Sequence, residues 1–238
     1  MAFNPTKCSI IRIRSNKRQK IIYYPYKLHG HILVEEEHSK YLGVTISNKL
    51  TWTKHIEAVA AKGRKSLGFL RRNFWQCNSN IKSTMYTTLV RPVLEYASPV
   101  WNPSLQKNIH ELEKVQRSAA RFATNNYKER TAGTMTRLLK SLKWDSLEYR
   151  RKQASVISLF RIVNNLVDID SNYIQYTDSR TRGPKKLFQP RTTTPQERES
   201  FFAKAIPWWN KLPDVLRDTQ ELEAFKTKLA SFSPTLLN

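Results

Sequence analysis

A change of hydrophobic period near residue 50 divides the chain into a β-rich part and a helical part. In the stretch 40–46 (KYLGVTI), Val44 and Ile46 alternate with Gly43 and Thr45, which is typical of a half-buried strand. Ser47-Asn48-Lys49 follows as a predicted turn, because Ser and Asn side chains bond to their own backbone in turns. From Trp52 onward the apolar residues recur at helical spacing. A sheet therefore ends here and a helical region begins.

Residues 1–50 predict a short antiparallel β region. Strands are expected at Lys7–Ile13 and Ile21–Tyr24, and a hairpin is expected around Gly30. Gly43, in the last strand, would let a second backbone approach closely. A sheet with so few strands is not stable alone and needs a packing partner. We therefore expect these strands to carry exposed apolar surface.

Residues 51–127 predict a bundle of three amphipathic helices joined by short polar loops. The apolar stripe of the first helix is Trp52, Ile56, Val59, Ala60, Gly63, Leu67, Leu70 and Phe74. The second helix has Asn78-Ser79-Asn80 as N-cap candidates, a kink at Pro92, and an apolar face of Ile81, Met85, Leu89, Val93 and Leu94. The third runs from about Leu105 to Phe122. The fold class is therefore α+β and mostly α.

Residues 128–238 predict a less regular helical region. Helices are expected around Met135–Leu139, from Ser146 onward, and over 220–232, and the aromatic segment 200–213 should pack on the preceding helices. Arg150-Arg151-Lys152 is expected on a polar side. Segment 177–194 is predicted to be a mobile basic loop or a disordered linker, and it carries Arg180, Arg182, Lys185 and Lys186.

Positive charge is the strongest indication of a partner. The 238 residues carry a formal charge of +22, which a polyanion would neutralise; nucleic acid is the first expectation and an anionic membrane surface the second. Between Glu57 and Glu95 the sequence has no acidic residue. Either this face is merely solvated, or it binds nucleic acid. The candidate contacts are Lys54, Lys62, Arg64, Lys65, Arg71 and Arg72, with the four cations of the 177–194 loop.

No catalytic or metal-binding pattern accompanies this charge. The sequence lacks a Gly-rich phosphate loop, a Ser/His/Asp arrangement and paired carboxylates, and no residue is predicted to hold a metal. Cys8 and Cys77 match neither a metal-ligand spacing nor a disulfide framework, so both are expected to be reduced thiols. With no signal peptide or transmembrane run, we expect an intracellular protein, nuclear or cytoplasmic. The residues alone indicate a basic binding module.

The order of short motifs resembles the C-terminal part of reverse transcriptases from non-LTR retrotransposons, the long interspersed, jockey-like elements. Phe3-Asn4-Pro5-Thr6-Lys7-Cys8 resembles the segment after the catalytic strands of the palm, and Lys40-Tyr41-Leu42-Gly43-Val44 resembles the primer grip. The thumb-like motifs are Leu50-Thr51-Trp52 with His55-Ile56, Leu67–Asn73, Leu89–Ala97 with Val100-Trp101, and Glu113–Phe122. Ile206-Pro207, Trp209-Asn210 and Leu212-Pro213 resemble a recurring C-terminal segment.

The resemblance implies three regions: the end of a palm with the primer-grip strand at 1–50, a thumb-like bundle at 51–127 and a C-terminal helical region at 128–238. It also implies primer-grip-like roles for Tyr41, Leu42 and Gly43, and makes Lys7 a candidate general acid. The Asp-Asp turn that holds two metals in these polymerases is not found in the sequence. We therefore expect a truncated RNA-directed DNA polymerase that is inactive alone, with Mg²⁺ required only by an intact enzyme.

The expected partners are RNA or an RNA–DNA hybrid, and the missing upstream part of the same polyprotein. Two alternatives remain open: a basic nucleic-acid-binding module with a new role, and an untranslated or non-functional relic.

Overall fold

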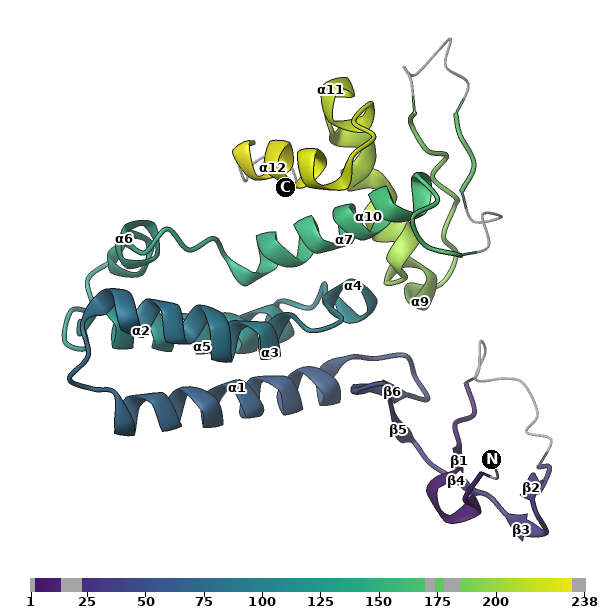
Figure 1. Cartoon of the computed structure of the whole chain (residues 1–238). Coiled ribbons are helices and arrows are strands. Elements are labelled where there is room, and N and C mark those ends of the chain that lie inside the picture. The colour runs from purple at the N-terminus through teal and green to yellow at the C-terminus, as the bar shows by residue number, and fades with distance from the viewer. Residues whose placement is uncertain (1–2, 14–22, 170–173, 178–184, 233–238) are drawn as a thin grey trace. The chain divides into compact units, whose positions relative to one another are not determined.

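The computed structural model describes residues 3–13, 23–169, 174–177 and 185–232. The chain divides into two units, Met1–Val59 and Ala60–Asn238, which are treated separately. The first unit contains the short strands and the second most of the helices (Figure 1). The predicted class, α+β and mostly α, is confirmed.

The described residues of the first unit form three two-stranded sheets. Its elements are the 3₁₀ helix η1 (Pro5–Lys7), β1 (Ser9–Ile10), β2 (Lys27–Leu28), β3 (His31–Ile32), β4 (Val34–Glu35), β5 (His38–Tyr41) and β6 (Val44–Ser47). The hairpin predicted around Gly30 is confirmed as β2–β3. Strand β1 is shorter than expected, and its pairing with β4 is parallel, so the prediction of antiparallel pairing is wrong there. The strand expected at 21–24 lies partly outside the described residues, and Tyr23 and Tyr24 are not in a strand.

The stretch predicted as one strand, residues 40–46, is a hairpin. Strands β5 and β6 pair antiparallel, with Tyr41 opposite Val44, and Leu42 and Gly43 form the two-residue turn. Their φ angles are +46° and +85°, as a type I′ turn requires at both central positions. Gly43 is therefore explained by the turn and not by the close approach of a second backbone.

Helix α1 (Thr53–Asn73) begins in the first unit and continues into the second. Its predicted apolar stripe is confirmed: Ile56, Ala60, Gly63, Leu67 and Leu70 are buried, and the outer members of the stripe are half-buried. At Gly63 an added Cβ would lie 2.6 Å from Cδ2 of the buried Leu94. Glycine therefore allows the close packing of α1 at this position.

The second predicted helix is one continuous helical run that contains a π turn. It comprises α2 (Ser79–Met85), η2 (Tyr86–Val90) and α3 (Arg91–Glu95), and Asn78 caps it by accepting a hydrogen bond from the Ile81 N–H. Pro92 has no N–H to donate within the helix. The residue before it, Arg91, donates its N–H to the Tyr86 carbonyl five residues back, which is the hydrogen bond of a π turn. The predicted apolar face is correct at Leu94, which is buried, but wrong at Ile81 and Leu89, which are exposed. The other buried positions of the run are Lys82, Tyr86 and Val90.

The core of the bundle is completed by α4 (Ser98–Trp101), α5 (Gln106–Thr124), α6 (Thr134–Ser141) and α7 (Leu147–Val163) (Figure 1). Ile109, Leu112, Val115, Ala119 and Phe122 of α5 are buried, as predicted. Two polar residues of the same helix orient its neighbours. Glu113 accepts the backbone N–H of Glu148 at the start of α7, and Gln116 accepts the Tyr86 hydroxyl and donates to the Asp145 carbonyl.

The C-terminal segment packs on α7, as predicted. Its helices are α9 (Pro195–Arg198), α10 (Phe201–Lys211), α11 (Asp214–Arg217) and α12 (Leu222–Ser231), and α10 and α12 both contact α7. The rings of Phe160 and Phe225 stack at 4.2 Å, beside the buried Trp209. The polar side expected for residues 150–152 is wrong for Arg151, which is fully buried and bonds Asn102.

Candidate nucleic-acid interface

One face of helix α1 carries exposed cations that have no partner among the described residues. Within the second unit these are Lys62, Lys65 and Arg72. Lys65 and Arg72 are seven residues apart, so they lie on nearly the same side of the helix, opposite the buried stripe. No hydrogen bond or ion pair engages these three side chains within the described part of the chain. They are available to a ligand.

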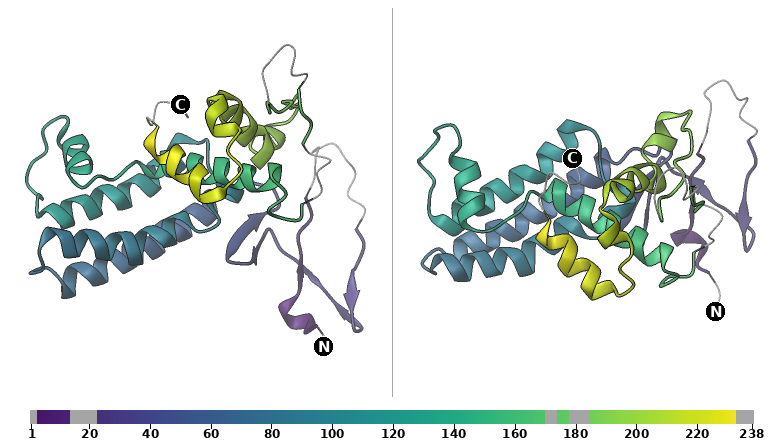
Figure 2. Two further views of the ribbon diagram at one scale, coloured as in Figure 1. Left: turned by 45° about the horizontal axis from the view of Figure 1, so that its top comes forward. Right: turned by 90° about the horizontal axis from the view of Figure 1, so that it is seen from above.

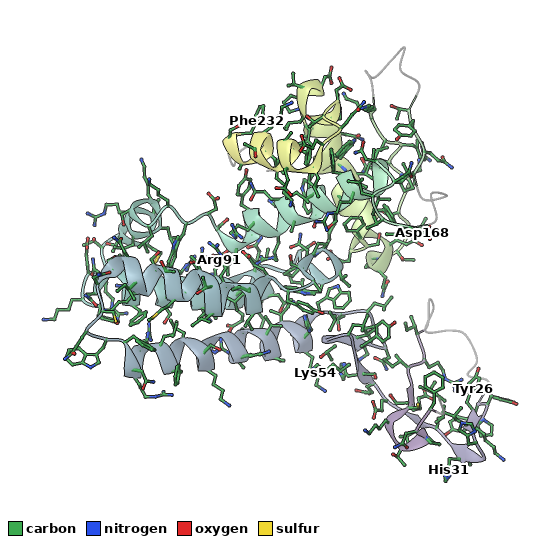
Figure 3. All side chains as sticks on the ribbon, viewed as in Figure 1. Tyr26, His31, Lys54, Arg91, Asp168 and Phe232 are labelled. Carbon is green, nitrogen blue, oxygen red and sulfur yellow. The ribbon has the colours of Figure 1, made fainter. Side chains whose placement is uncertain are left out.

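Lys54 lies on the first turn of α1, within the first unit (Figure 3). It is exposed, and the described residues offer it no ion pair. Lys54 is therefore exposed in the first unit, as Lys65 and Arg72 are in the second.

The other two candidates on α1, Arg64 and Arg71, are already engaged by α5. Arg64 forms a 3.3 Å ion pair with Glu111, and a hydrogen bond from Lys114, followed by Arg64, lowers the pKa of that carboxyl below its ordinary value. Arg71 donates to both the carbonyl (2.6 Å) and the hydroxyl (2.7 Å) of Ser118. These two arginines link α1 to α5. Their charges are therefore less available to a ligand than those of the exposed face.

Lys82, which contributes to the acid-free stretch, is fully buried. Its ammonium donates to Asn125 Oδ1 at 2.6 Å and lies 5.1 Å from the centre of the Phe122 ring. Asn125 caps the C-terminus of α5, where the helix dipole favours a cation. Lys82 therefore belongs to the packing of α2 on α5 and cannot reach a ligand.

The four candidates from the basic loop separate into two pairs. Arg180 and Arg182 lie outside the described residues. Lys185 and Lys186 are half-buried, and Lys185 lies 3.7 Å from Asp218. The Lys185 carbonyl accepts the Trp209 indole N–H, and Tyr176 forms a bridge with the buried Leu187. The expected mobile loop is wrong for residues 185–187, because α10 anchors them.

The residues compared with a primer grip lie at the tip of the β5–β6 hairpin. Tyr41 and Leu42 are exposed, and Leu42 and Gly43 form the turn itself. Lys7 ends the 3₁₀ helix η1 and is also exposed. The roles that the resemblance assigns to these four residues remain predictions.

The motif at the start of α1 has a structural explanation. His55 is buried, and its Nδ1 accepts the backbone N–H of Thr45 at 3.2 Å, which links strand β6 to the first turn of α1. Burial, and then the charge of Lys40, lower the pKa of His55. The neutral ring with a free Nδ1 lone pair is the form that this hydrogen bond requires.

The sequence reasoning missed a second group of cations around the end of α5 and α6. Lys128, Arg130, Lys140 and Lys143 are exposed and have no ion pair among the described residues. The signal for them was present, because residues 121–143 contain six Lys and Arg but a single Glu. That residue, Glu129, accepts hydrogen bonds from Asn126, Thr134 and Thr131, which together with Arg137 lower its pKa to about 2.

Two absences bear on chemistry. Within the described ranges no three His, Cys, Asp or Glu side chains come together as a group that could hold a metal ion. None of the helices in the described part of the chain has the length and apolar character needed to cross a bilayer.

Comparison with known proteins identifies relatives for part of the chain. The chain is 29% identical over 109 residues to a probable RNA-directed DNA polymerase from transposon BS of Drosophila melanogaster, a match that covers 42% of this chain and 12% of the relative. It is 25% identical over 92 residues to the corresponding protein from transposon X-element of the same organism, covering 36% and 10%. No protein-family profile matches the chain, and no solved structure does.

These matches support a region related to the reverse transcriptases of non-LTR transposons. The matched region spans about a tenth of the length of each relative.

Proposed function

We propose that the chain derives from the C-terminal part of a non-LTR retrotransposon reverse transcriptase and binds RNA or an RNA–DNA hybrid by its backbone. In this proposal the helices after residue 50 act as a thumb-like bundle, and the β5–β6 hairpin acts as a primer-grip-like element. The partial similarity to transposon polymerases supports the origin of the chain. We place the activity inside the cell, in the nucleus or the cytoplasm, where such templates occur.

The observation that carries the proposal is the contrast between two sets of cations on one helix. Arg64 and Arg71 are held by α5, whereas Lys62, Lys65 and Arg72 are exposed and have no partner among the residues that the structure describes. Unpaired cations aligned along a helix can follow a phosphate backbone, and each phosphate contact releases condensed counterions. Such binding is independent of sequence, because phosphates carry no base information.

We further propose that this chain does not polymerise DNA by itself. A polymerase needs carboxylates that hold two metal ions, and the described residues contain no group that fits such a centre. Mg²⁺ would then be required only by an intact enzyme, whose catalytic carboxylates would come from an upstream part of the same polyprotein. A primer-extension assay with this chain on an RNA template should show no template-dependent product. Extension above a no-protein control would contradict the proposal.

The binding proposal is tested by paired charge variants. The variant Lys65→Ala with Arg72→Ala should weaken binding to an RNA–DNA hybrid, measured by fluorescence anisotropy at fixed salt. The matched control, Lys107→Ala with Arg161→Ala, removes one lysine and one arginine that are exposed on α5 and α7. Equal weakening by both variants would indicate that net charge alone governs binding, and the assignment of the α1 face would be rejected.

A further inference from the structure

The C-terminal ends of helices α1 and α5 lie side by side within the second unit. Arg71 in the last turns of α1 donates to Ser118 in the last two turns of α5, so the C-terminal ends of these helices are adjacent (Figure 2). The segments that follow, after Asn73 and after Thr124, therefore leave the same end of the bundle. We call the exposed residues Trp75, Tyr127, Lys128 and Arg130 the end surface.

The end surface presents two large aromatic rings to solvent. Trp75 is 65% exposed and Tyr127 is 48% exposed. The guanidinium of Arg71 lies 6.0 Å from the centre of the Tyr127 ring, so the same arginine that joins α1 to α5 also supports this ring. Exposed tryptophan and tyrosine side chains offer flat faces with a polar edge, which suits stacking against another planar group.

The residues that follow Tyr127 in the chain carry positive charge that no ion pair neutralises within the described ranges. Lys128 and Arg130 are exposed and form no ion pair within the described ranges. Glu129, between them, is occupied by Arg137 and by the hydroxyls of Thr131 and Thr134. Residues 121–143 keep a net charge of +5, from six Lys and Arg against one Glu. The surface therefore fits a ligand that is both anionic and planar.

Unpaired nucleotides combine these two properties. In a duplex the base faces are stacked on one another and are closed to side chains, whereas in a single strand every base can stack on an aromatic ring. We propose that the end surface binds single-stranded nucleic acid, with Trp75 and Tyr127 stacking on bases and with Lys128 and Arg130 contacting phosphates. Arg71 acts as a positioning residue for Tyr127. This inference rests on the proposed function only in that both require the chain to bind nucleic acid.

The test compares strands that differ in their bases. The full chain is titrated with a labelled oligouridylate, a labelled oligothymidylate, and an abasic strand that keeps the phosphates but lacks the bases. The strands with bases should bind more tightly than the abasic strand, and Trp75→Ala and Tyr127→Ala should each weaken their binding by about five- to 100-fold. The abasic strand should bind each variant as it binds the unaltered chain. The two homopolymers show whether RNA or DNA is preferred.

Control variants separate stacking from loss of structure. Tyr127→Phe keeps the ring and should retain binding, and Tyr96→Ala removes a comparably exposed ring (58%) elsewhere in the same unit and should change nothing. Equal affinity for strands with and without bases, or unchanged binding by Trp75→Ala with Tyr127→Ala, would overturn the inference. The variant Lys65→Ala with Arg72→Ala could bind the RNA–DNA hybrid as tightly as the unaltered chain does, while single strands still bind through their bases. This result would reject the proposed role of the α1 face and support that of the end surface.

Discussion

His55 shows how a single residue of a recognisable motif performs a structural task. Its imidazole Nδ1 accepts the N–H of Thr45, and the side chain is buried where the hairpin β5–β6 meets helix α1. The sequence placed His55 beside Trp52 at the start of a helix but gave no sign of this hydrogen bond. The partner is a backbone group ten residues away, and periodicity does not report such contacts.

This geometry makes the hairpin–helix junction sensitive to pH. Burial, with Lys40, lowers the pKa of His55, so the folded chain resists protonation more than the unfolded chain does. The stability contributed by His55 is complete above its unfolded pKa of about 6.5 and is lost as the pH falls below it. The protection factor of the Thr45 amide, which is its exchange rate relative to an unfolded peptide at the same pH, should fall over this range, and His55→Gln should remove this pH dependence. Persistence of the same dependence in His55→Gln, with His110→Gln as control, would contradict this assignment.

Buried cations are the residues at which sequence reasoning failed most clearly. Lys82 lies in the acid-free basic stretch and Arg151 is expected on a polar side, yet both side chains are fully buried and bond the side-chain oxygens of Asn125 and Asn102. Long basic side chains can bury their aliphatic stems and find neutral acceptors. Charge patterning therefore identifies a basic stretch but does not tell which of its members remain free.

Among the elements, α1 was predictable and the α2–α3 run was not. The stripe of α1 follows the regular 3.6-residue period, which one sequence is enough to show. In the second helix the π turn over Tyr86–Val90 changes the local period, so that buried positions recur every fourth residue from Lys82 to Leu94. Two of those four positions are Lys82 and Tyr86, which a hydrophobic pattern does not mark as buried. The pattern therefore favoured the preceding residues Ile81 and Met85.

Two glycines of α1 provide a matched test of its packing. At Gly63 a Cβ would meet Leu94 at 2.6 Å and Val115 at 3.4 Å, whereas at Gly68 it would meet only Arg72 Nη1, at 3.4 Å. Alanine is favoured over glycine in a helix by about 1 kcal/mol, and overpacking a core costs about 1–3 kcal/mol. Gly68→Ala should raise the melting temperature and Gly63→Ala should lower it. If Gly63→Ala stabilised the protein as much as Gly68→Ala, the close packing of α1 on Leu94 would be disproved.

At the scale of the whole molecule, the two units differ in how they bury apolar surface. The second unit has an extensive core, whereas Val44 and Ile56 are the buried hydrophobic side chains among the described residues of the first. Ile32, Val34, Tyr41 and Leu42 are among its exposed apolar residues, as the sequence predicted. Strands with so little packing should open readily.

We therefore expect weak amide protection in β1–β6 and reversible self-association of the chain. Hydrogen exchange should show fast exchange in these strands beside slow exchange in α5 and α7. Sedimentation should show a concentration-dependent increase in mass, because exposed apolar surface favours association. A strictly monomeric chain with full protection throughout residues 38–47 would show that this unit is stable by itself.

The sequence was informative about the fold class and the helices because both depend on the local hydrophobic pattern. It was less informative about strand pairing: β1 pairs in parallel with β4, about 25 residues away, and no local rule specifies that partner. The exposed cations of α1 could be assigned from the helical wheel alone. The end surface could not, because it requires the knowledge that Arg71 brings the ends of α1 and α5 together.

The central claim is that the exposed cations of α1 contact phosphates, and the dependence of affinity on salt measures this most directly. For an RNA–DNA hybrid, the slope of log affinity against log salt should become shallower by about two units in the variant Lys65→Ala with Arg72→Ala, one for each lost phosphate contact. Thermal melts should remain unchanged, because both side chains are exposed. An unchanged slope in a folded double variant would show that this face of α1 is only solvated and would contradict the account.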